Sequence, residues 1–254
     1  MLLAVDIGNT NIVLGAMEDE KILFEARIAT DLIRTSDQYA VDIKNILGLY
    51  NMNGSEFDGC ILSSVVPPLL NSFKTAIRKV TGKIPMIVGP DIKTGLNILI
   101  DNPEQAGGDL VVGAVAAVRE YESPMAIVDM GTATTITILN EDGAFIGGCI
   151  CPSVKISMEA LNTRTAQLPG ISLQAPEKVI GTNTVDCMQS GIMYGAAAML
   201  DGLIQRMEEE AGHPMNVIVT GGISRFVIPM CRHEMTYDKD LLLKGLWILY
   251  EMNK

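Results

Sequence analysis

The sequence LLAVDIGNTNIVL at Leu2–Leu14 decides the fold of this chain. An apolar run leads to Asp6, the polar turn Gly8–Asn11 follows, and a second apolar run begins. This pattern predicts a buried strand, a tight turn and a second strand that folds back on the first. Gly8 lets the backbone take a positive φ or approach a ligand closely. Because burying a bare carboxylate is costly, Asp6 either binds the metal and phosphates of a nucleotide or caps its own turn.

A second copy of this pattern lies near the middle of the chain. Ala126–Thr132, with the sequence AIVDMGT, again places an acid two residues before a glycine, and a β-branched run follows. Asp6 and Asp129 are 129 − 6 = 123 residues apart, close to half of the 254 residues. Such an internal repeat predicts two lobes of one design, which we place at 1–121 and 122–254. Two acid-bearing turns that face each other can hold one ligand between them.

Composition excludes several classes of protein. The net charge is −11 and the basic residues are scattered, so we expect no nucleic-acid partner. No apolar stretch reaches the ~18 residues of a membrane span, and Asp6 interrupts the apolar start, so we expect neither a membrane anchor nor a signal peptide. The five cysteines are an odd number without a C-x-x-C pair, which indicates small buried side chains in a reducing cytoplasm.

The missing motifs narrow the chemistry further. The chain has neither the P-loop pattern G-x-x-x-x-G-K-[ST] nor a G-x-G-x-x-G dinucleotide loop. Its two histidines, His213 and His233, lie in polar surroundings typical of a surface. We therefore expect neither a His-based triad nor a His-rich metal site.

Predicted strands and helices alternate along the rest of the chain, which favours an α/β fold. Pro152 fits the first turn of a helix that ends at Leu161. The other expected strands are Lys21–Ile28, Cys60–Val66, Pro85–Val88, Asn97–Ile100, Thr134–Ile138 and Val217–Thr220. One further helix is expected to start at Thr35–Asp37, and the others are expected to span Leu69–Thr81, Leu110–Val118, Val185–Glu210 and Lys239–Glu251.

Gly107-Gly108-Asp109 introduces one of these helices and has two interpretations. Asp109 is either the N-cap of the helix, a common use of aspartate, or a carboxylate that a substrate can approach over the two glycines. The sequence alone favours the cap.

Taken together in this order, the motifs resemble the type III pantothenate kinases of bacteria, and the resemblance covers essentially the whole chain. The motifs that carry it are Asp6–Asn11, Ser63–Pro67, Asp101–Pro103, Gly107–Asp109, Asp129–Thr134, Thr182–Thr184, Thr220–Gly222 and Leu243–Leu246. The resemblance implies the two-lobed, duplicated ribonuclease-H-like fold of the actin-like ATPases, with mixed sheets, flanking helices and a nucleotide cleft.

The family transfers a phosphoryl group from ATP to the primary hydroxyl of pantothenate, the first step towards coenzyme A. By resemblance, Asp109 is the catalytic base, Asp129 binds a monovalent cation (potassium or ammonium), and Asp6 lies near the magnesium of ATP. The implied ATP-binding residues are Asp6, Ile7, Gly8, Asn9, Thr10, Asn11, Ile12, Val13 and Thr132, and the implied pantothenate-binding residues are Gly107, Gly108, Asp109, Leu110 and Thr184. The resemblance also implies a homodimer whose active sites are completed across the interface.

Two positions depart from the family pattern. Leu110 stands where the family usually has arginine, and Ile100 stands where it often has tyrosine. Losing a charge-assisted contact to the carboxylate of pantothenate costs about 1.5–3 kcal/mol. Three interpretations stay open: a pantothenate kinase with a rebuilt pocket, a kinase for another small alcohol, or a weakly active or inactive paralogue that acts as a nucleotide-binding regulator.

Overall fold

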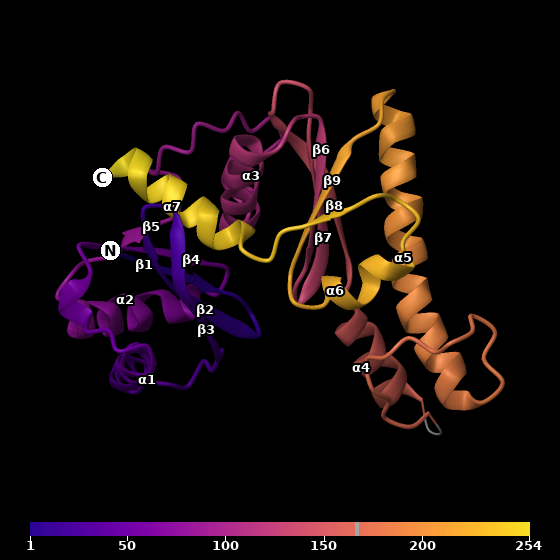
Figure 1. Ribbon diagram of the computed structural model, residues 1–254, viewed down its shortest axis with the longest axis horizontal. Helices are drawn as coiled ribbons and strands as arrows, with labels where there is room; N and C mark the ends of the chain where they lie inside the picture. The colour runs from indigo at the N-terminus through magenta and orange to yellow at the C-terminus, as the bar shows by residue number, and fades with distance from the viewer. Residues whose placement is uncertain (166–167) are drawn as a thin grey trace. The chain divides into compact units, whose positions relative to one another are not determined.

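The structure, a computed structural model, describes residues 1–165 and 168–254. These residues form two compact units, each built on a five-stranded sheet (Figure 1). The first unit contains Met1–Leu96, Asp101–Arg119 and Asp240–Lys254, and the second contains Asn97–Ile100 and Glu120–Lys239. No helix within the described ranges combines the length and the hydrophobicity that a bilayer crossing requires.

The sheet of the first unit has the strand order β3-β2-β1-β4-β5. Its strands are β1 (Leu2–Ile7), β2 (Asn11–Glu18), β3 (Lys21–Ala29), β4 (Gly59–Ser64) and β5 (Met86–Ile87). β1, β2 and β3 form an antiparallel meander, whereas β4 runs parallel to β1 and β5 parallel to β4. The opening stretch therefore forms the predicted hairpin, and every residue of β1 is buried.

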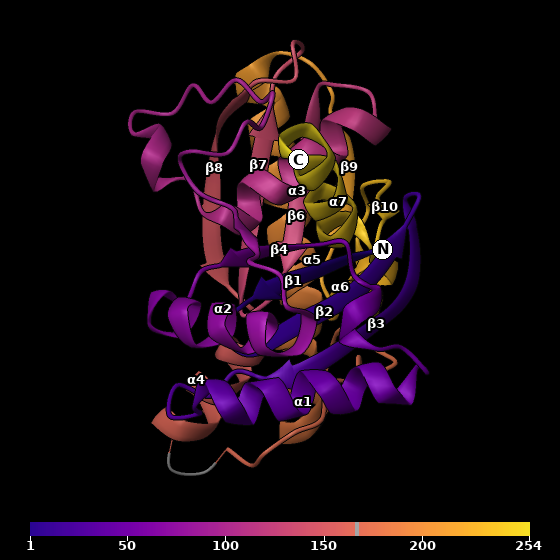
Figure 2. The same cartoon turned by 90° about the vertical axis from the view of Figure 1, so that its left-hand side faces the viewer.

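Helices cover both faces of this sheet. They are α1 (Ser36–Leu49), α2 (Pro67–Thr81), α3 (Gly108–Glu120) and α7 (Leu241–Asn253), with 3₁₀ turns η1 (Gly54–Glu56) and η2 (Pro103–Gln105). α1 starts where the sequence predicts, because Thr35 and Gln38 form a capping box. α1 and α2 lie side by side on one face (Figure 2), where Tyr39 and Phe73 join the core beneath β1. α7 packs on β1 and β4 from the other face.

The second unit repeats this topology. Its strands are β6 (Met125–Met130), β7 (Ala133–Leu139), β8 (Phe145–Pro152), β9 (Asn216–Thr220) and β10 (Thr236–Tyr237), and its helices are α4 (Val154–Arg164), α5 (Thr184–Ala211) and α6 (Ser224–Val227), with the 3₁₀ turn η3 (Ile228–Met230). The strand order is β10-β9-β6-β7-β8, with β6, β7 and β8 antiparallel and β9 and β10 parallel. Read from its other edge, this is the order of the first sheet, so the predicted duplication is confirmed.

The structure differs from the predicted elements at Pro152. This proline is the last residue of β8 and does not open a helix. Ser153 is the N-cap of α4, and its hydroxyl accepts a hydrogen bond from the Ile156 N–H at 3.3 Å. The side chain of a serine supplies the acceptor that a helix start needs, which a proline cannot do.

The compact units are divided between Arg119 and Glu120, and two segments belong to the unit on the other side of this division. The C-terminal helix α7 belongs to the first unit, because its buried leucines complete the second face of that sheet. Asn97–Ile100 belongs to the second unit, because its backbone pairs with the start of β8: the Leu99 N–H donates to the Phe145 carbonyl at 2.8 Å. This segment forms an isolated bridge and not the expected strand.

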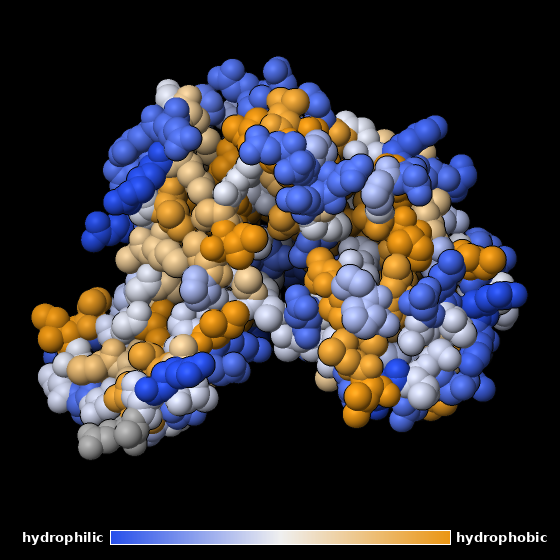
Figure 3. All heavy atoms as spheres, turned by 180° about the vertical axis from the view of Figure 1, so that it is seen from behind, coloured by the Kyte–Doolittle hydropathy of each residue, from blue (hydrophilic) through white to orange (hydrophobic). Residues whose placement is uncertain are grey.

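The long helix α5 packs one face on the second sheet and leaves the other exposed. Ile192, Met193, Leu200 and Ile204 enter the hydrophobic core of the unit. Seen from behind, the middle of α5 shows largely hydrophobic atoms and its C-terminal end hydrophilic ones (Figure 3). Small residues, Gly191, Gly195 and Ala198, are exposed on this helix.

Candidate active site

The first acid-bearing turn lies at the carboxyl end of β1. Asp6 is 8% exposed and faces the side of the sheet that α7 covers, since its neighbours Val5 and Ile7 enter the opposite core. The turn that follows is held at both ends: the Gly8 N–H donates to the Asn11 carbonyl at 3.0 Å, and the Thr30 hydroxyl donates to the Gly8 carbonyl at 2.6 Å. The polar residues Asn9–Asn11 of the turn are exposed.

Ser63 joins Asp6 at this end of the sheet. It is the residue of β4 that pairs with Asp6 in the parallel ladder, and residues so paired face the same side. Ser63 is fully buried, and its hydroxyl has no hydrogen-bond partner among the described residues. Unpaired buried hydroxyls are rare, because each one loses its hydrogen bonds to water and gains none from the protein. The sequence motif Ser63–Pro67 begins with this serine, but the motif predicts no role for its hydroxyl in the site.

The start of α3 lies against the same hydroxyl. A Cβ added to Gly108 would sit 3.3 Å from the Ser63 Oγ, so glycine allows this close approach. Asp109 is the next residue, in the first turn of the helix. The structure therefore brings Asp6, Ser63 and the first turn of α3 to one end of one sheet.

The predicted N-cap role of Asp109 is wrong. The helix begins at Gly108, and the Val111 N–H donates to the Gly107 carbonyl at 3.1 Å, which places the cap at Gly107. Asp109 is half-buried, and its Oδ1 accepts the Leu110 N–H at 2.9 Å. Burial raises the pKa of the Asp109 carboxyl, because the charged form loses hydration, although hydrogen bonds from the backbone partly oppose this shift.

The second acid-bearing turn lies in the second unit. Asp129 is half-buried near the end of β6 and pairs in the ladder with Thr220 of β9. Gly221 follows with a φ of 93°, and a Cβ on it would lie 2.8 Å from the Asp129 Oδ1 and 2.6 Å from the Met130 carbonyl oxygen. Only glycine fits here, so the backbone of the Gly221 turn lies directly against the carboxylate. Thr132, in the turn after β6, is exposed.

Thr184 is an exposed residue at the start of α5, where Asn183 caps the helix by accepting the Asp186 N–H at 3.0 Å. It belongs to the second unit, whereas Gly107–Leu110 belong to the first. The remaining predicted nucleotide residues, Ile7 and Asn9–Val13, belong to the hairpin of β1 and β2 in the first unit.

The donor set fits magnesium bound together with phosphates. Among the described residues, no group of three or more His, Cys, Asp or Glu side chains converges as a metal site. Mg²⁺ usually binds through one or two carboxylates, water and substrate phosphates, so a single carboxylate such as Asp6 suffices.

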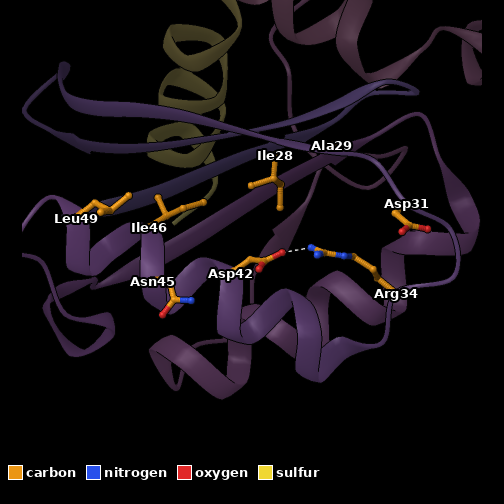
Figure 4. A pocket seen from close by; sticks show the side chains of 8 residues that line it. All are labelled: Ile28, Ala29, Asp31, Arg34, Asp42, Asn45, Ile46 and Leu49. Carbon is orange, nitrogen blue, oxygen red and sulfur yellow. Dashed lines mark hydrogen bonds and ion pairs between the residues drawn. The ribbon is translucent and has the colours of Figure 1, made fainter.

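A cavity of about 430 Å³ lies elsewhere in the first unit (Figure 4). It is lined by the end of β3 and one side of α1, and Arg34 pairs with Asp42 across it. The cavity is on the face of the sheet that α1 and α2 cover, since Ile28 packs with that core. None of the predicted site residues lines it, and Asp6 faces the other side of the sheet.

Comparison with known proteins identifies relatives over the whole chain. The family model described as type III pantothenate kinase matches residues 2–206. Proteins named type III pantothenate kinase from Halalkalibacterium halodurans and Exiguobacterium sibiricum are each 42% identical over 253 and 254 residues, and the alignments cover 100% of this chain and 100% of each relative.

Solved structures resemble the fold at much lower identity. Component A of (R)-2-hydroxyglutaryl-CoA dehydratase from Acidaminococcus fermentans has a TM-score of 0.58 at 15% identity, with 98% of this chain and 95% of that chain covered. The ROK hexokinase from Thermus thermophilus has a TM-score of 0.52 at 10% identity, with 98% of both chains covered. These similarities support the actin-like ATPase fold alone.

Proposed function

Because this chain belongs to the type III pantothenate kinase family, we propose that it transfers the γ-phosphoryl group of ATP to the primary hydroxyl of pantothenate. The observation that carries this proposal is 42% identity to such kinases across the full length of both chains. The reaction is the first step towards coenzyme A. Since ATP is a cytoplasmic cosubstrate, we propose that the enzyme works in the cytoplasm.

Asp109 is the proposed base that takes the proton of the attacking hydroxyl. A base works best when its pKa is close to the working pH, and burial moves the pKa of Asp109 upward in that direction. The base also needs a fixed orientation, which the hydrogen bond from the Leu110 N–H favours. Gly107, Gly108 and Leu110 would line the pantothenate beside it.

Ser63 is proposed as a positioning residue for this base. Its unpaired hydroxyl lies against Gly108, one residue before Asp109. A hydrogen bond from Ser63 to the first turn of α3 would hold that turn in place once substrate orders it. The energetic cost of leaving the hydroxyl unpaired in the unliganded chain is then offset in the complex.

The exposed turn Gly8–Asn11 is the proposed cradle for the phosphates. Thr132 is a further proposed ATP-binding residue. Phosphoryl transfer depends on positioning and on neutralising charge on the phosphoryl oxygens. Backbone N–H groups and small hydroxyls supply both. Magnesium bound with ATP supplies further charge neutralisation, and Asp6 is the carboxylate proposed to lie beside it.

Asp129 is the proposed ligand of a monovalent cation, potassium or ammonium. Its carboxylate is a hard oxygen donor, and the Met130 carbonyl lies beside the same glycine turn. Removing Asp129 should therefore change how the rate depends on potassium and leave the fold intact.

We further propose a homodimer formed through α5. Its exposed glycines have no side chain to hold a neighbour away, and a Cβ at Gly191 or Gly195 would meet nothing within 4 Å, so a second helix can approach closely. Thr184 begins the same helix, and in this proposal it contacts the pantothenate bound by the partner. A dimer in solution, seen by light scattering, would support this arrangement.

A coupled assay of ADP release tests the proposed function. The full chain is mixed with magnesium ATP, potassium and pantothenate, and controls omit pantothenate or replace it with other small alcohols. Turnover that requires pantothenate supports the proposal. Nucleotide binding without turnover would instead favour the regulator, and turnover on another alcohol would favour a changed substrate, both of which Leu110 makes reasonable.

A further inference from the structure

Two cysteines lie side by side on β8, the last strand of the second sheet. Cys149 and Cys151 are two residues apart, so their side chains face the same side of the strand, and both are half-buried. Their sulfur atoms are 3.9 Å apart. The proposed kinase chemistry makes no use of either thiol.

This separation fits a shared metal ion better than a disulfide. A disulfide needs sulfurs about 2.05 Å apart, with Cβ atoms about 3.8 Å apart. Two sulfurs that bind one tetrahedral ion at about 2.3 Å lie roughly 3.8 Å from each other. The ladder to β7 holds both residues in extended backbone, pairing Cys149 with Ile136 and Cys151 with Thr134. The strand therefore presents the two sulfurs at the spacing of a metal-bound pair.

An independent observation points to the same place. Thr134 is fully buried, and its hydroxyl lacks a hydrogen-bond partner among the described residues. Thr134 is the residue directly opposite Cys151, and directly paired residues face the same side of a sheet, with Cβ atoms about 4.5–5.5 Å apart. A hydroxyl in this position can donate a hydrogen bond to the thiolate of Cys151. A thiolate is a strong hydrogen-bond acceptor, whereas a neutral thiol is a weak one.

We propose that Cys149 and Cys151, supported by the hydroxyl of Thr134, bind one thiophilic cation of the zinc, cadmium or copper(I) class. Both thiols lose their protons to solvent, the ion gains two sulfur ligands, and no oxidant is required. The described residues offer no third His, Cys, Asp or Glu at this point, so water completes the coordination. The site is separate from the proposed kinase function and does not depend on it.

The Cys149 thiol is expected to stay protonated in the absence of metal. Burial, followed by the neighbouring Cys151, raises the pKa of the Cys149 thiol to about 11. Cys149 is therefore a poor nucleophile at neutral pH. Metal binding must displace protons, so the affinity should rise steeply with pH.

Titration of the reduced full-length chain with cadmium tests the proposal. Cadmium bound by thiolate gives ultraviolet charge-transfer absorption, which we expect to saturate at one ion per chain with the release of two protons. Cys149→Ser and Cys151→Ser should each abolish this absorption. Cys187→Ser is the matched control, because Cys187 is exposed on α5 and should leave the titration unchanged.

Thr134→Val tests the supporting hydroxyl, since valine keeps the shape and removes the hydrogen bond. It should retain the absorption but weaken cadmium binding about tenfold. Circular dichroism without cadmium checks that each variant folds, and Cys149→Ala replaces any serine variant that does not. Absorption that survives in both cysteine variants, or that halves in each, would overturn the proposal. So would a loss of two mass units on exposure to oxidised glutathione, which means a disulfide forms directly.

Discussion

Ser63→Ala should make the protein more stable, which is unusual for a substitution in a buried strand. The Ser63 hydroxyl is fully buried and, among the described residues, unpaired. A buried hydroxyl without a hydrogen bond destabilises the fold by ~1–3 kcal/mol. Removing it relieves this cost, but the small void that it leaves cancels part of the stabilisation. We expect the free energy of unfolding to rise by about 1 kcal/mol, which raises the melting temperature by roughly 2–4 °C in a chain of this size.

Ser64→Ala is the matched control, because the same substitution at the neighbouring serine should lower the stability of the fold. The Ser64 Oγ accepts the Val66 N–H at 3.0 Å, at the start of α2. Its loss should lower the free energy of unfolding by about 0.5–1.5 kcal/mol. Urea denaturation of both variants beside the parent measures the two values. A Ser63→Ala variant as unstable as Ser64→Ala would show that the buried hydroxyl is paired, and the reasoning would fail.

The same variant tests whether the hydroxyl serves the reaction. If Ser63 positions the first turn of α3, Ser63→Ala should lower kcat by about tenfold while the KM for ATP stays unchanged. A stabilised variant with the parent's kcat would leave Ser63 without a role in positioning Asp109.

Four further predictions concern Asp109 and the second acid-bearing turn. Asp109→Asn should lower kcat about 10²- to 10⁴-fold with little change in nucleotide affinity, because asparagine keeps the acceptor for the Leu110 N–H but cannot take a proton; nearly full activity would contradict the base assignment. Because the pKa of Asp109 is raised and the active form is the carboxylate, kcat of the parent should fall as the pH drops through that raised pKa, at a higher pH than for an ordinary aspartate; a rate that is flat down to pH ~4 argues against it. Asp129→Ala should remove the dependence of the rate on potassium, and an unchanged potassium titration would assign Asp129 a structural role. Gly221→Ala should destabilise the second unit by roughly 1–3 kcal/mol because of the positive φ at this position. The new Cβ would also lie 2.6 Å from the Met130 carbonyl oxygen, and this clash should add to the destabilisation. Thermal unfolding measures the effect, and a neutral result would mean that this turn adopts another conformation.

Hydrophobic periodicity and capping residues predicted most of the elements correctly. The hairpin of β1 and β2 was predicted from two apolar runs on either side of a glycine turn, and the start of α1 was predicted from Thr35–Asp37. The repeated acid-and-glycine pattern predicted the duplicated topology of the two sheets. These signals are local, and a single sequence contains them in full.

The errors have a different physical origin. A proline is equally compatible with a strand end and a first helical turn, so Pro152 could not be assigned without its partner strand. The position of Asp109 depends on which residue first adopts helical geometry, and a single residue separates a cap from a first-turn acid. The unpaired hydroxyl of Ser63 results from contacts among β1, β4 and α3, which no local pattern records.

The packing of α7 on β1 and β4 has a consequence for biosynthesis. The ribosome makes β1 before α7, so this face of the N-terminal sheet stays uncovered until α7 has been made. A stop codon just before Leu241 would therefore damage the N-terminal sheet, although it leaves the sequence of that sheet unchanged. Nascent chains stalled at that point should bind chaperones through the uncovered face of β1 and β4.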